Sequence, residues 1–148
     1  IVLSPADGRV TRVESDGTGT LISIFLSVLD VHVNRSPMSG TVESVRHRPG
    51  KYLNAMNERS SGENEQNELI LKTGHGPVAV TQIAGLIARR IVCRARPGDR
   101  LEPGERFGLI RFGSRTDLLL PPGATPAVAP GDRVAGGRSI VARWSGRT

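Results

Sequence analysis

The sequence predicts an all-β protein, a compact sandwich or barrel of short strands that forms a single domain over residues 1–148. Three observations lead to this prediction. The chain has 18 glycines and 10 prolines, spread along its whole length. Short apolar runs rich in Val, Ile and Leu lie between these turn-forming residues, a spacing typical of sandwiches and barrels. A chain of 148 residues is also long enough to bury one sizeable core.

Strands are expected wherever such an apolar run occurs between turn signals. The stretch Ile83–Val92 is ambiguous, because its apolar residues fall at helical spacing while its β-branched content favours a strand; we interpret it as a strand. The segment Asn54–Gln66 is polar and without pattern, and a loop of this length suggests function or disorder. The other expected strands are Gly8–Glu14, Thr20–Leu26, Leu29–Val33, Gly40–Arg46, Glu68–Thr73, Val78–Ile83, Phe107–Phe112, Thr116–Leu120 and Arg138–Arg143.

A weak internal repeat links distant parts of the chain. The segment Gly98-Asp-Arg-Leu-Glu-Pro-Gly104 is echoed by Gly131-Asp-Arg-Val-Ala-Gly-Gly137, and Ser36–Val45 has a related pattern. Each Gly-Asp pair predicts a tight turn between β-hairpins. The pattern resembles the hairpin half-motifs of lipoyl and biotinyl carrier domains. The carrier lysine that those families place at a hairpin tip is not found here, so the repeat predicts the architecture and not a carrier function.

The composition limits the possible functions. The single cysteine, Cys93, allows no internal disulfide and suggests no cysteine-based metal site, which fits a reducing compartment. The longest apolar run, Leu21–Leu29, is shorter than the roughly 18–20 residues that span a bilayer. The net charge of +6 comes from 18 Arg and only two Lys against 14 acidic residues. This basic balance suggests an anionic partner such as phospholipid headgroups, a phosphorylated substrate or nucleic acid, or simply reflects genome composition. The few aromatic residues argue against a base-stacking surface.

One dipeptide, Gly113-Ser114, follows the expected strand Phe107–Phe112 and allows two interpretations. The first is an ordinary turn between two strands. The second is a scissile bond, because glycine has no Cβ and leaves its carbonyl open to close approach. The hydroxyl of the serine could then attack that carbonyl if a base and an oxyanion site were nearby.

The other candidate groups are a histidine and an aspartate. In Asp30-Val-His-Val-Asn34 a strand would place His32 on one face with its two polar neighbours, as either a proton-transfer group or an exposed strand histidine. His47 and His75 are interpreted as surface residues. Asp7 lies in the turn sequence Pro-Ala-Asp-Gly and, taken alone, is interpreted as structural. No group of residues has metal-ligand spacing.

Taken together, several segments resemble the phosphatidylserine decarboxylase family, in the family's order and over nearly the whole chain. The ending Gly-Ser-Arg is similar to that of the shorter, bacterial and archaeal branch. The matching segments are Ser4–Val10, Phe25–Gly40, Asn57–Ser60, Val80–Gly85 and Gly104–Arg115.

The resemblance implies a pyruvoyl-dependent carboxy-lyase that is made as a self-processing proenzyme. Ser114 would attack the carbonyl of Gly113, so that the chain divides into a β chain, residues 1–113, and an α chain, residues 114–148. The former Ser114 would become a covalent pyruvoyl group, and the enzyme would decarboxylate phosphatidylserine to phosphatidylethanolamine. His32 matches the expected proton donor of turnover, and Asp7 matches an aspartate that assists self-cleavage.

Two departures from the family pattern bear on mechanism and location. The longer branch has a second histidine as the base for self-cleavage, and Arg35 stands at that position here. An arginine stays protonated and is a poor base. Family members often carry a hydrophobic, membrane-associating segment before this domain, which the sequence from Ile1 onward does not show. The base for self-cleavage therefore stays open between His32 and another group.

The resemblance also implies partners and substrate contacts. Candidates for binding the headgroup are Asn57, Arg59 and Arg111, with Arg89 and Arg90 as further possible phosphate contacts, and the Asn54–Gln66 loop is expected to close over it. We expect a peripheral enzyme on the cytoplasmic face of the cell membrane, acting on an aminophospholipid and without a nucleic acid partner; a homo-oligomer is possible. The alternative is a non-catalytic β-barrel module that binds anionic lipid or nucleic acid through an Arg-rich surface.

Overall fold

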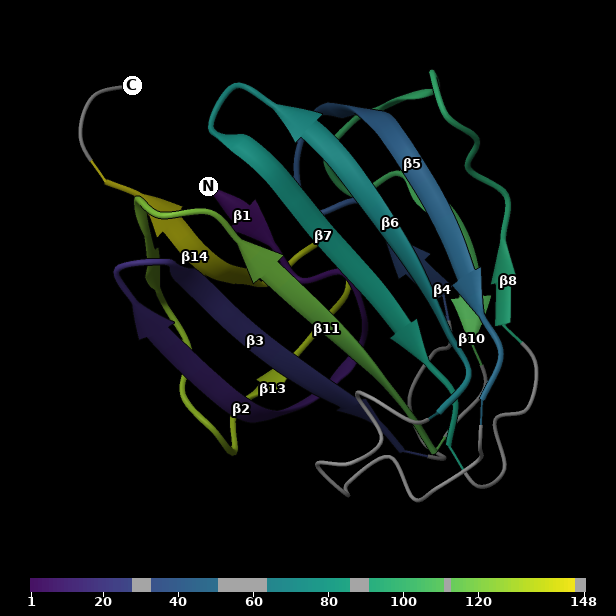
Figure 1. The fold of residues 1–148 in the computed structure, drawn as a ribbon. Coiled ribbons are helices and arrows are strands. Elements are labelled where there is room, and N and C mark those ends of the chain that lie inside the picture. The colour runs from purple at the N-terminus through teal and green to yellow at the C-terminus, as the bar shows by residue number, and fades with distance from the viewer. Residues whose placement is uncertain (28–32, 51–63, 86–90, 111–112, 146–148) are drawn as a thin grey trace.

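The structure is a computed structural model, and it describes residues 1–27, 33–50, 64–85, 91–110 and 113–145 (Figure 1). Every regular element in these residues is a β-strand, so the all-β prediction is confirmed. No helix in this part of the chain is long and apolar enough to cross a membrane. The strands are β1 (Val2–Leu3), β2 (Gly8–Asp16), β3 (Gly19–Leu26), β4 (Val33–Arg35), β5 (Gly40–Arg48), β6 (Gln66–Thr73), β7 (Gly76–Ile83), β8 (Ile91–Cys93), β9 (Arg100–Leu101), β10 (Arg106–Ile110), β11 (Ser114–Leu120), β12 (Ala124–Pro126), β13 (Arg133–Val134) and β14 (Ile140–Trp144).

The strands form one large and two small antiparallel sheets. The large sheet has eight strands in the order β13-β2-β3-β11-β7-β6-β5-β9, and the small sheets are β1-β14-β12 and β4-β10-β8 (Figure 1). Buried side chains from all three sheets pack into one hydrophobic cluster, which includes Ile24 of β3, Phe107 of β10 and Val141 of β14. The core therefore lies between the curled large sheet and the two small sheets.

Alternation along the strands explains why these residues bury this face. On β11, Leu118 and Leu120 are buried while Leu119 between them is half exposed. On the neighbouring β3, Ile22, Ile24 and Leu26 are fully buried, and Ile22 pairs with Leu118. Burying one large aliphatic side chain stabilises a fold by about 1.5–3 kcal/mol. This row of side chains therefore fixes the register of the two central strands.

The sequence repeat corresponds to an internal duplication of the fold. In both copies a Gly-Asp turn leads into a two-residue edge strand, β9 in one copy and β13 in the other. The Gly98 N–H donates to the Val42 carbonyl at 2.8 Å, and the Gly131 N–H donates to the Val10 carbonyl at 2.7 Å. Both glycines have positive φ, 96° and 99°, a conformation that favours glycine. The two turns are therefore built in the same way.

The correspondence extends over the described strands. The β2–β3 and β5–β6 pairs carry a register shift at the same place, after Val10 and after Val42. The β1–β14 and β4–β10 pairs share a second equivalent shift. A pseudo-twofold axis between β11 and β7 thus relates an inserted half, β4–β10, to a flanking half, β1–β3 with β11–β14. The hairpin half-motifs predicted from the sequence are these two halves.

The strand predictions hold with two corrections. The expected strand Arg138–Arg143 begins only at Ile140, because the N–H groups of Arg138 and Ser139 donate to the Ala135 carbonyl in the turn before β14. In the stretch Ile83–Val92, Ala84 and Gly85 lie outside any strand and β8 begins only at Ile91, so the strand prediction is wrong there. Ala84 leaves the sheet because other groups satisfy its backbone. Its N–H donates to the Glu65 carbonyl at 2.9 Å, and its carbonyl accepts from Asn64 Nδ2 at 2.6 Å.

Other differences concern short or undescribed segments. The strands β1, β9, β12 and β13 have only two or three residues each, too few for an alternation to show in the sequence. Of the expected strand Leu29–Val33, only Val33 lies within the described residues, and it begins β4. The expected end of the strand at Phe112 also lies outside them. The edge strands β9 and β13 each pair with only two residues of their neighbours, β5 and β2. A homo-oligomer stays a prediction.

Candidate active site

The predicted cleavage position lies at one end of the large sheet. β11 begins at Ser114, and the neighbouring Arg115 pairs with Ile83, the last residue of β7. The strands β2 and β11 run in the same direction on either side of β3, and both begin at this end (Figure 1). The described ends of β3, β4, β7, β8 and β10 that adjoin the undescribed segments lie on the same side. The site is therefore at a sheet end where many connections meet.

Gly113 has a backbone conformation that favours glycine. Its φ is +78°, which an L-residue with a Cβ adopts only at a cost of about 1–2 kcal/mol. Its N–H donates to the Leu26 carbonyl at 2.7 Å, which anchors the turn to the end of β3. Ser114, the next residue, is fully buried and pairs with Leu26. The dipeptide is thus a turn in which a half-buried glycine, anchored to β3, precedes a buried serine.

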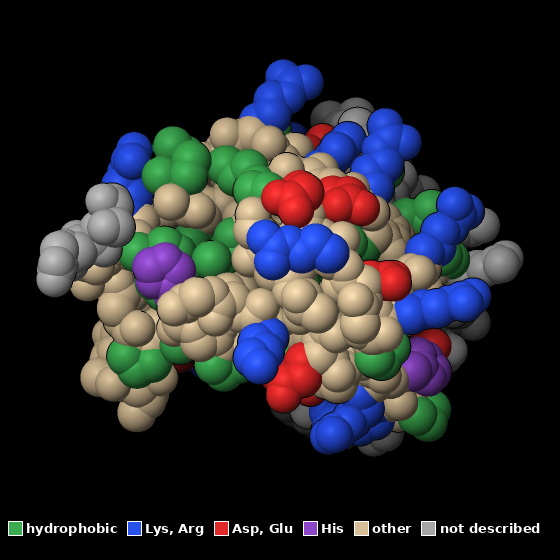
Figure 2. Space-filling view, turned by 90° about the horizontal axis from the view of Figure 1, so that it is seen from above, with side chains coloured by type: hydrophobic (Ala, Val, Ile, Leu, Met, Phe, Trp, Pro, Cys, Tyr) green, Lys and Arg blue, Asp and Glu red, His purple; other side chains and the backbone are tan. Residues whose placement is uncertain are grey.

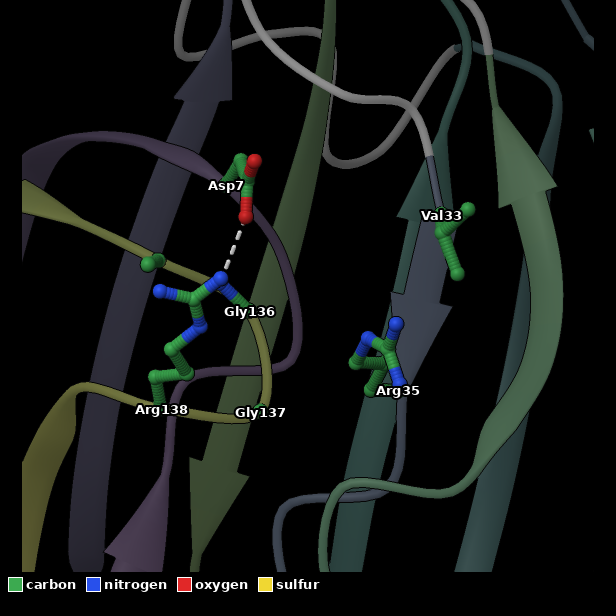
Figure 3. Close-up of a pocket in the computed structure, with 7 residues that line it drawn as sticks. Asp7, Val33, Arg35, Gly136, Gly137 and Arg138 are labelled. Atoms are coloured by element: carbon green, nitrogen blue, oxygen red, sulfur yellow. Dashed lines mark hydrogen bonds between the residues drawn. The ribbon is translucent and has the colours of Figure 1, made fainter.

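Asp7 lies in the loop that leads into β2 and is held by the C-terminal part of the chain. Asp7 Oδ1 accepts a hydrogen bond of 2.6 Å from the backbone N–H of Gly136 (Figure 3). A Cβ on Gly136 would come within 3.3 Å of that carboxylate oxygen, so glycine allows the close approach. A Cβ on Gly8 would clash with the Phe25 carbonyl. The Asp-Gly pair therefore has a tertiary role that the turn interpretation did not include.

Asp7 and Ser114 are brought to the same end of the sheet by the register of three strands. Arg9 on β2 and Arg115 on β11 both pair with Phe25 on β3, from opposite sides. Two strand spacings separate such residues, about 10 Å. Asp7 and Ser114 each precede these residues, so they lie at the same end of the sheet, on opposite sides of β3.

A buried polar network joins residues close in sequence to the two groups, namely Pro5 before Asp7 and Thr116 after Ser114. Asn34 of β4 donates through Nδ2 to Thr116 Oγ1 at 3.1 Å and, more weakly, to the Pro5 carbonyl at 3.4 Å. Its Oδ1 accepts from Gln82 Nε2 at 2.9 Å. Gln82 Oε1 in turn accepts from Asn67 Nδ2 at 3.0 Å. Pro5 contributes its backbone carbonyl. The other residues of the network contribute side chains, and all of these are fully or almost fully buried. The network ties the loop before Asp7 to β4 and to the strand that begins at Ser114.

The duplication shows that the fold does not need this network. By the pairing registers, the positions that the pseudo-twofold axis relates to Asn34, Thr116 and Gln82 are apolar and fully or almost fully buried in the other copy, whereas Asn67 corresponds to the buried Thr20. Buried polar groups add specificity or function more readily than stability. The polar residues Asn34, Thr116 and Gln82 are therefore particular to one copy and to the sheet end at which it lies. The counterparts of Asn34, Thr116 and Gln82 are Val2, Val78 and Leu120, respectively.

A pocket of about 440 Å³ opens beside Asp7. Figure 3 shows the Gly136–Gly137 turn between Arg138 and Arg35, with Asp7 on the side of Arg138. Val33, the first described residue after His32, also lines the pocket. Arg35, the residue at the family's second histidine position, thus lines the same pocket as the candidate aspartate.

The model of one protein family, described as phosphatidylserine decarboxylase, matches residues 1–142 of the chain. The chain belongs to the phosphatidylserine decarboxylase family. This membership confirms the resemblance seen in the sequence and identifies the protein as a decarboxylase, a carboxy-lyase of phospholipid biosynthesis with a phospholipid substrate. The match includes both Asp7 and the Gly113-Ser114 bond.

Several family-derived site predictions lie outside the described residues. These are His32, Asn57, Arg59 and Arg111, together with Arg89 and Arg90. Of the Asn54–Gln66 loop, only the last residues are described. Asn64 there is buried, and Gln66 begins β6. The structure thus places Asp7 and Arg35 at one pocket and Ser114 at the same end of the large sheet, while the roles of these residues and the headgroup contacts stay predictions.

The two described histidines lie at the surface, as predicted from the sequence. His47 and His75 are exposed; His47 pairs with Glu65 at 2.7 Å, and His75 stacks on Trp144 with ring centroids 4.1 Å apart. Figure 2 shows one face where basic side chains are interspersed with acidic ones. Exposed pairs such as Arg12–Glu14 and Arg100–Glu102 are part of this pattern. Among the described residues, no group of three or more His, Cys, Asp or Glu could hold a metal ion.

Sequence reasoning missed the polar network and the Gly136–Gly137 turn. The alternation of Asp30, His32 and Asn34 gave a partial signal for Asn34, but its partners are far away in sequence. Gly136 and Gly137 lie in the repeated Gly-Asp segment, which was interpreted as architecture alone.

Proposed function

We propose that this decarboxylase is a self-processing proenzyme that cleaves its own Gly113–Ser114 bond and uses a pyruvoyl group made from Ser114. The observation that carries the proposal is the conformation of this bond. A positive-φ glycine is followed by a buried serine at the first position of a central strand. Together with the family membership, this supports a bond prepared for an N-to-O shift.

In the proposed processing, Ser114 Oγ attacks the carbonyl carbon of Gly113 and the amide becomes an ester. Loss of the Ser114 α-proton then eliminates the Gly113 carboxylate and leaves a dehydroalanine. Hydrolysis of that group releases ammonia and leaves the pyruvoyl group. We assign Asp7 to assist the first step, because it is held at the same strand end by the Gly136 N–H. Arg35 cannot replace a histidine as base.

Strand pairing between residues 114–148 and the rest of the protein would keep the two chains together after cleavage. Within residues 114–148, β11 pairs with β3 on one side and β7 on the other. β13 pairs with β2, and β14 pairs with β1. The proposed break lies just before β11, so it removes none of these pairings. The α and β chains would therefore remain one folded unit.

In turnover, the pyruvoyl group would supply a ketone that acts as the electron sink for loss of the substrate carboxylate. The chain's own residues would position the headgroup and return a proton. We propose His32 for the proton transfer, supported by Val33, its neighbour in the chain, which lines the Asp7 pocket. Burial of Ser114 would shield the reacting atoms from water.

The test is a denaturing intact-mass measurement of the purified chain. We expect two species, one ending at Gly113 and one whose mass fits a pyruvoyl group in place of Ser114. Ser114→Ala should remain a single chain without decarboxylase activity, whereas Ser15→Ala, an exposed serine of β2, should be processed normally. An uncut wild-type chain that decarboxylates phosphatidylserine would contradict the proposal.

We further propose peripheral binding at the cytoplasmic face of the membrane. The small sheet β4-β10-β8 supplies a surface on which Val33, Val92 and Leu109 lie beside Arg94 and Arg106. Leu109 is 38% exposed, and apolar side chains rimmed by arginine suit an anionic bilayer surface. The half-buried free thiol of Cys93 fits a reducing compartment.

Sedimentation with anionic phospholipid vesicles tests this surface. Leu109→Asp should reduce the bound fraction. Leu119→Asp, which changes another exposed leucine on β11, should leave the bound fraction unchanged. Equal losses in both variants would rule out a specific role for the small sheet.

A further inference from the structure

The pocket beside Asp7 contains two arginines that neither the family match nor the sequence prediction assigned to substrate. Arg35 comes from β4, and Arg138 comes from the turn between β13 and β14 (Figure 3). We propose that these two side chains form the subsite for the phosphodiester group of the aminophospholipid headgroup. This inference rests on the proposed function, because it deepens the description of the same site.

Arg35 is held in place before any ligand binds. Its Nη1 donates to the Gly104 carbonyl at 2.8 Å. Its side chain passes so close to Gly137 that a Cβ there would come 2.7 Å from Arg35 Cδ. Within the described residues, no carboxylate forms an ion pair with it. A guanidinium has five N–H donors, so the others remain for an anion, and little side-chain entropy is lost when one binds.

One copy of the repeated turn is one residue longer than the other, and the additional residue is Arg138. In the inserted half, the Gly104 N–H donates to the Ser36 carbonyl, and the Ser36 N–H donates to Glu105, the next residue. In the flanking half, the Gly137 N–H makes the equivalent bond to Ser4, but the Ser4 N–H donates to Ser139. One residue, Arg138, is therefore inserted between the two bonded positions, and its side chain lines the pocket.

The duplication also provides an internal comparison for Arg35. The Arg35 N–H donates to the Pro5 carbonyl at 2.9 Å, and in the other copy the Leu3 N–H donates to the Pro37 carbonyl at 2.9 Å. Arg35 thus corresponds to Leu3. The shared architecture requires neither arginine, so both are specific to the end of the sheet that carries Asp7.

The chemistry of decarboxylation favours the phosphate over the carboxylate as their ligand. The departing carboxylate disperses its charge in the transition state, so a cation fixed on it would stabilise the ground state more and slow the reaction. The phosphodiester keeps its charge throughout and lies only a few bonds from the amino group. A guanidinium pair on the phosphate therefore binds the substrate without opposing the chemical step.

The first experiment measures binding of glycerophosphoserine to the uncleaved Ser114→Ala chain, followed by NMR chemical shifts. We expect Arg138→Gln to weaken binding about tenfold, the effect of losing one charge-assisted contact at an exposed position. Arg35→Leu, which introduces the residue found in the other copy, should weaken binding by a similar factor. Arg143→Gln, an exposed arginine of β14 outside the pocket, is the matched control and should bind as the parent does.

The second experiment uses the processed enzyme and compares glycerophosphoserine with O-methylserine, which lacks the phosphate. Each arginine variant should lower kcat/KM for glycerophosphoserine about tenfold, mainly by raising KM. The kcat/KM for O-methylserine should stay within about twofold of the parent value. Inorganic phosphate should compete with glycerophosphoserine in the parent enzyme and less in the variants. Competition by inorganic phosphate with unchanged use of glycerophosphoserine would instead indicate a site for free phosphate and overturn the headgroup assignment.

The two proposals fail in different ways. If Arg138→Gln and Arg35→Leu bind glycerophosphoserine as tightly as Arg143→Gln does, the subsite is refuted whether or not the chain is processed. If the wild-type chain is not cleaved at Ser114 but the binding pattern holds, the pyruvoyl proposal fails and the subsite stands.

Discussion

Asn34→Val is predicted to destabilise the protein by about 2–3 kcal/mol. The substitution removes the 3.1 Å bond to Thr116 Oγ1 and the 2.9 Å bond from Gln82 Nε2, each with a net value of about 1 kcal/mol. It also leaves the buried Thr116 hydroxyl without this partner, which adds about 1 kcal/mol or more. Gln82 is affected less, because its Nε2 still donates to the Val92 carbonyl at 3.1 Å.

The duplication turns this substitution into a sharper test. Asn34 and Thr116 correspond to Val2 and Val78, both fully buried in the other copy. Thr116→Val alone should cost about 1–2 kcal/mol, since it leaves Asn34 Nδ2 with only the weak bond to a carbonyl. In the double variant neither polar group remains. Its loss of unfolding free energy should therefore be smaller than the sum of the losses in the two single variants, by about 1 kcal/mol or more.

Urea unfolding in the Ser114→Ala background measures these differences, because an uncut chain keeps the transition reversible. The m-value should stay constant across the four proteins of the cycle, so that shifts in midpoint report stability. Strictly additive losses would refute the idea that the network is one coupled unit. So would a change of less than about 0.5 kcal/mol for Asn34→Val.

Three further predictions follow from the same site. Gly113→Ala should destabilise the uncut chain by about 1–2 kcal/mol in urea unfolding, because alanine is strained at a φ of +78°, and should slow cleavage on denaturing gels. Asp7→Asn keeps an acceptor for the Gly136 N–H, so the melting temperature should change little while self-cleavage slows at least about tenfold; unchanged cleavage would remove Asp7 from the mechanism. Asp117 pairs with Arg115 Nε at 3.0 Å in a nearly buried position. Arg115→Met leaves that carboxylate without this ion pair and should lower the free energy of unfolding by about 3–5 kcal/mol, measured by calorimetry. Replacing both residues with apolar ones should lower it less.

Much of the fold could be predicted from the sequence because the long strands carry their own signal. On β3 and β11 the buried aliphatic residues alternate; β3 begins at a glycine, and β11 lies between Gly113 and Pro121. The Gly-Asp turns at Gly98 and Gly131 were visible as a repeat, because a positive φ and a short hydrogen-bonded turn restrict which residues fit. The two-residue strands could not be predicted, since their pairing depends on partners distant in the chain.

The candidate site was predictable only where the chemistry is local. The Gly113-Ser114 bond is a property of two adjacent residues and could be found by inspection. The network around Asn34 depends on Thr116 and Gln82, which are brought next to it by strand pairing and not by any sequence pattern. The pocket likewise depends on one inserted residue, Arg138, whose role appears only when the two copies of the turn are compared in space.

The duplication poses the question of why only one sheet end would be reactive. By the pairing registers, Ser114 corresponds to Gly76, the first residue of β7. In that copy the preceding residues, Gly74 and His75, form a tight turn joining β6 directly to β7, and Thr73 Oγ1 closes it with hydrogen bonds. A tight turn has no room for a substrate between its strands. In the other copy the whole inserted half separates β3 from β11, which frees that end of the sheet for a pocket. The insertion of one half into the other thus explains how a symmetric fold acquires a single site.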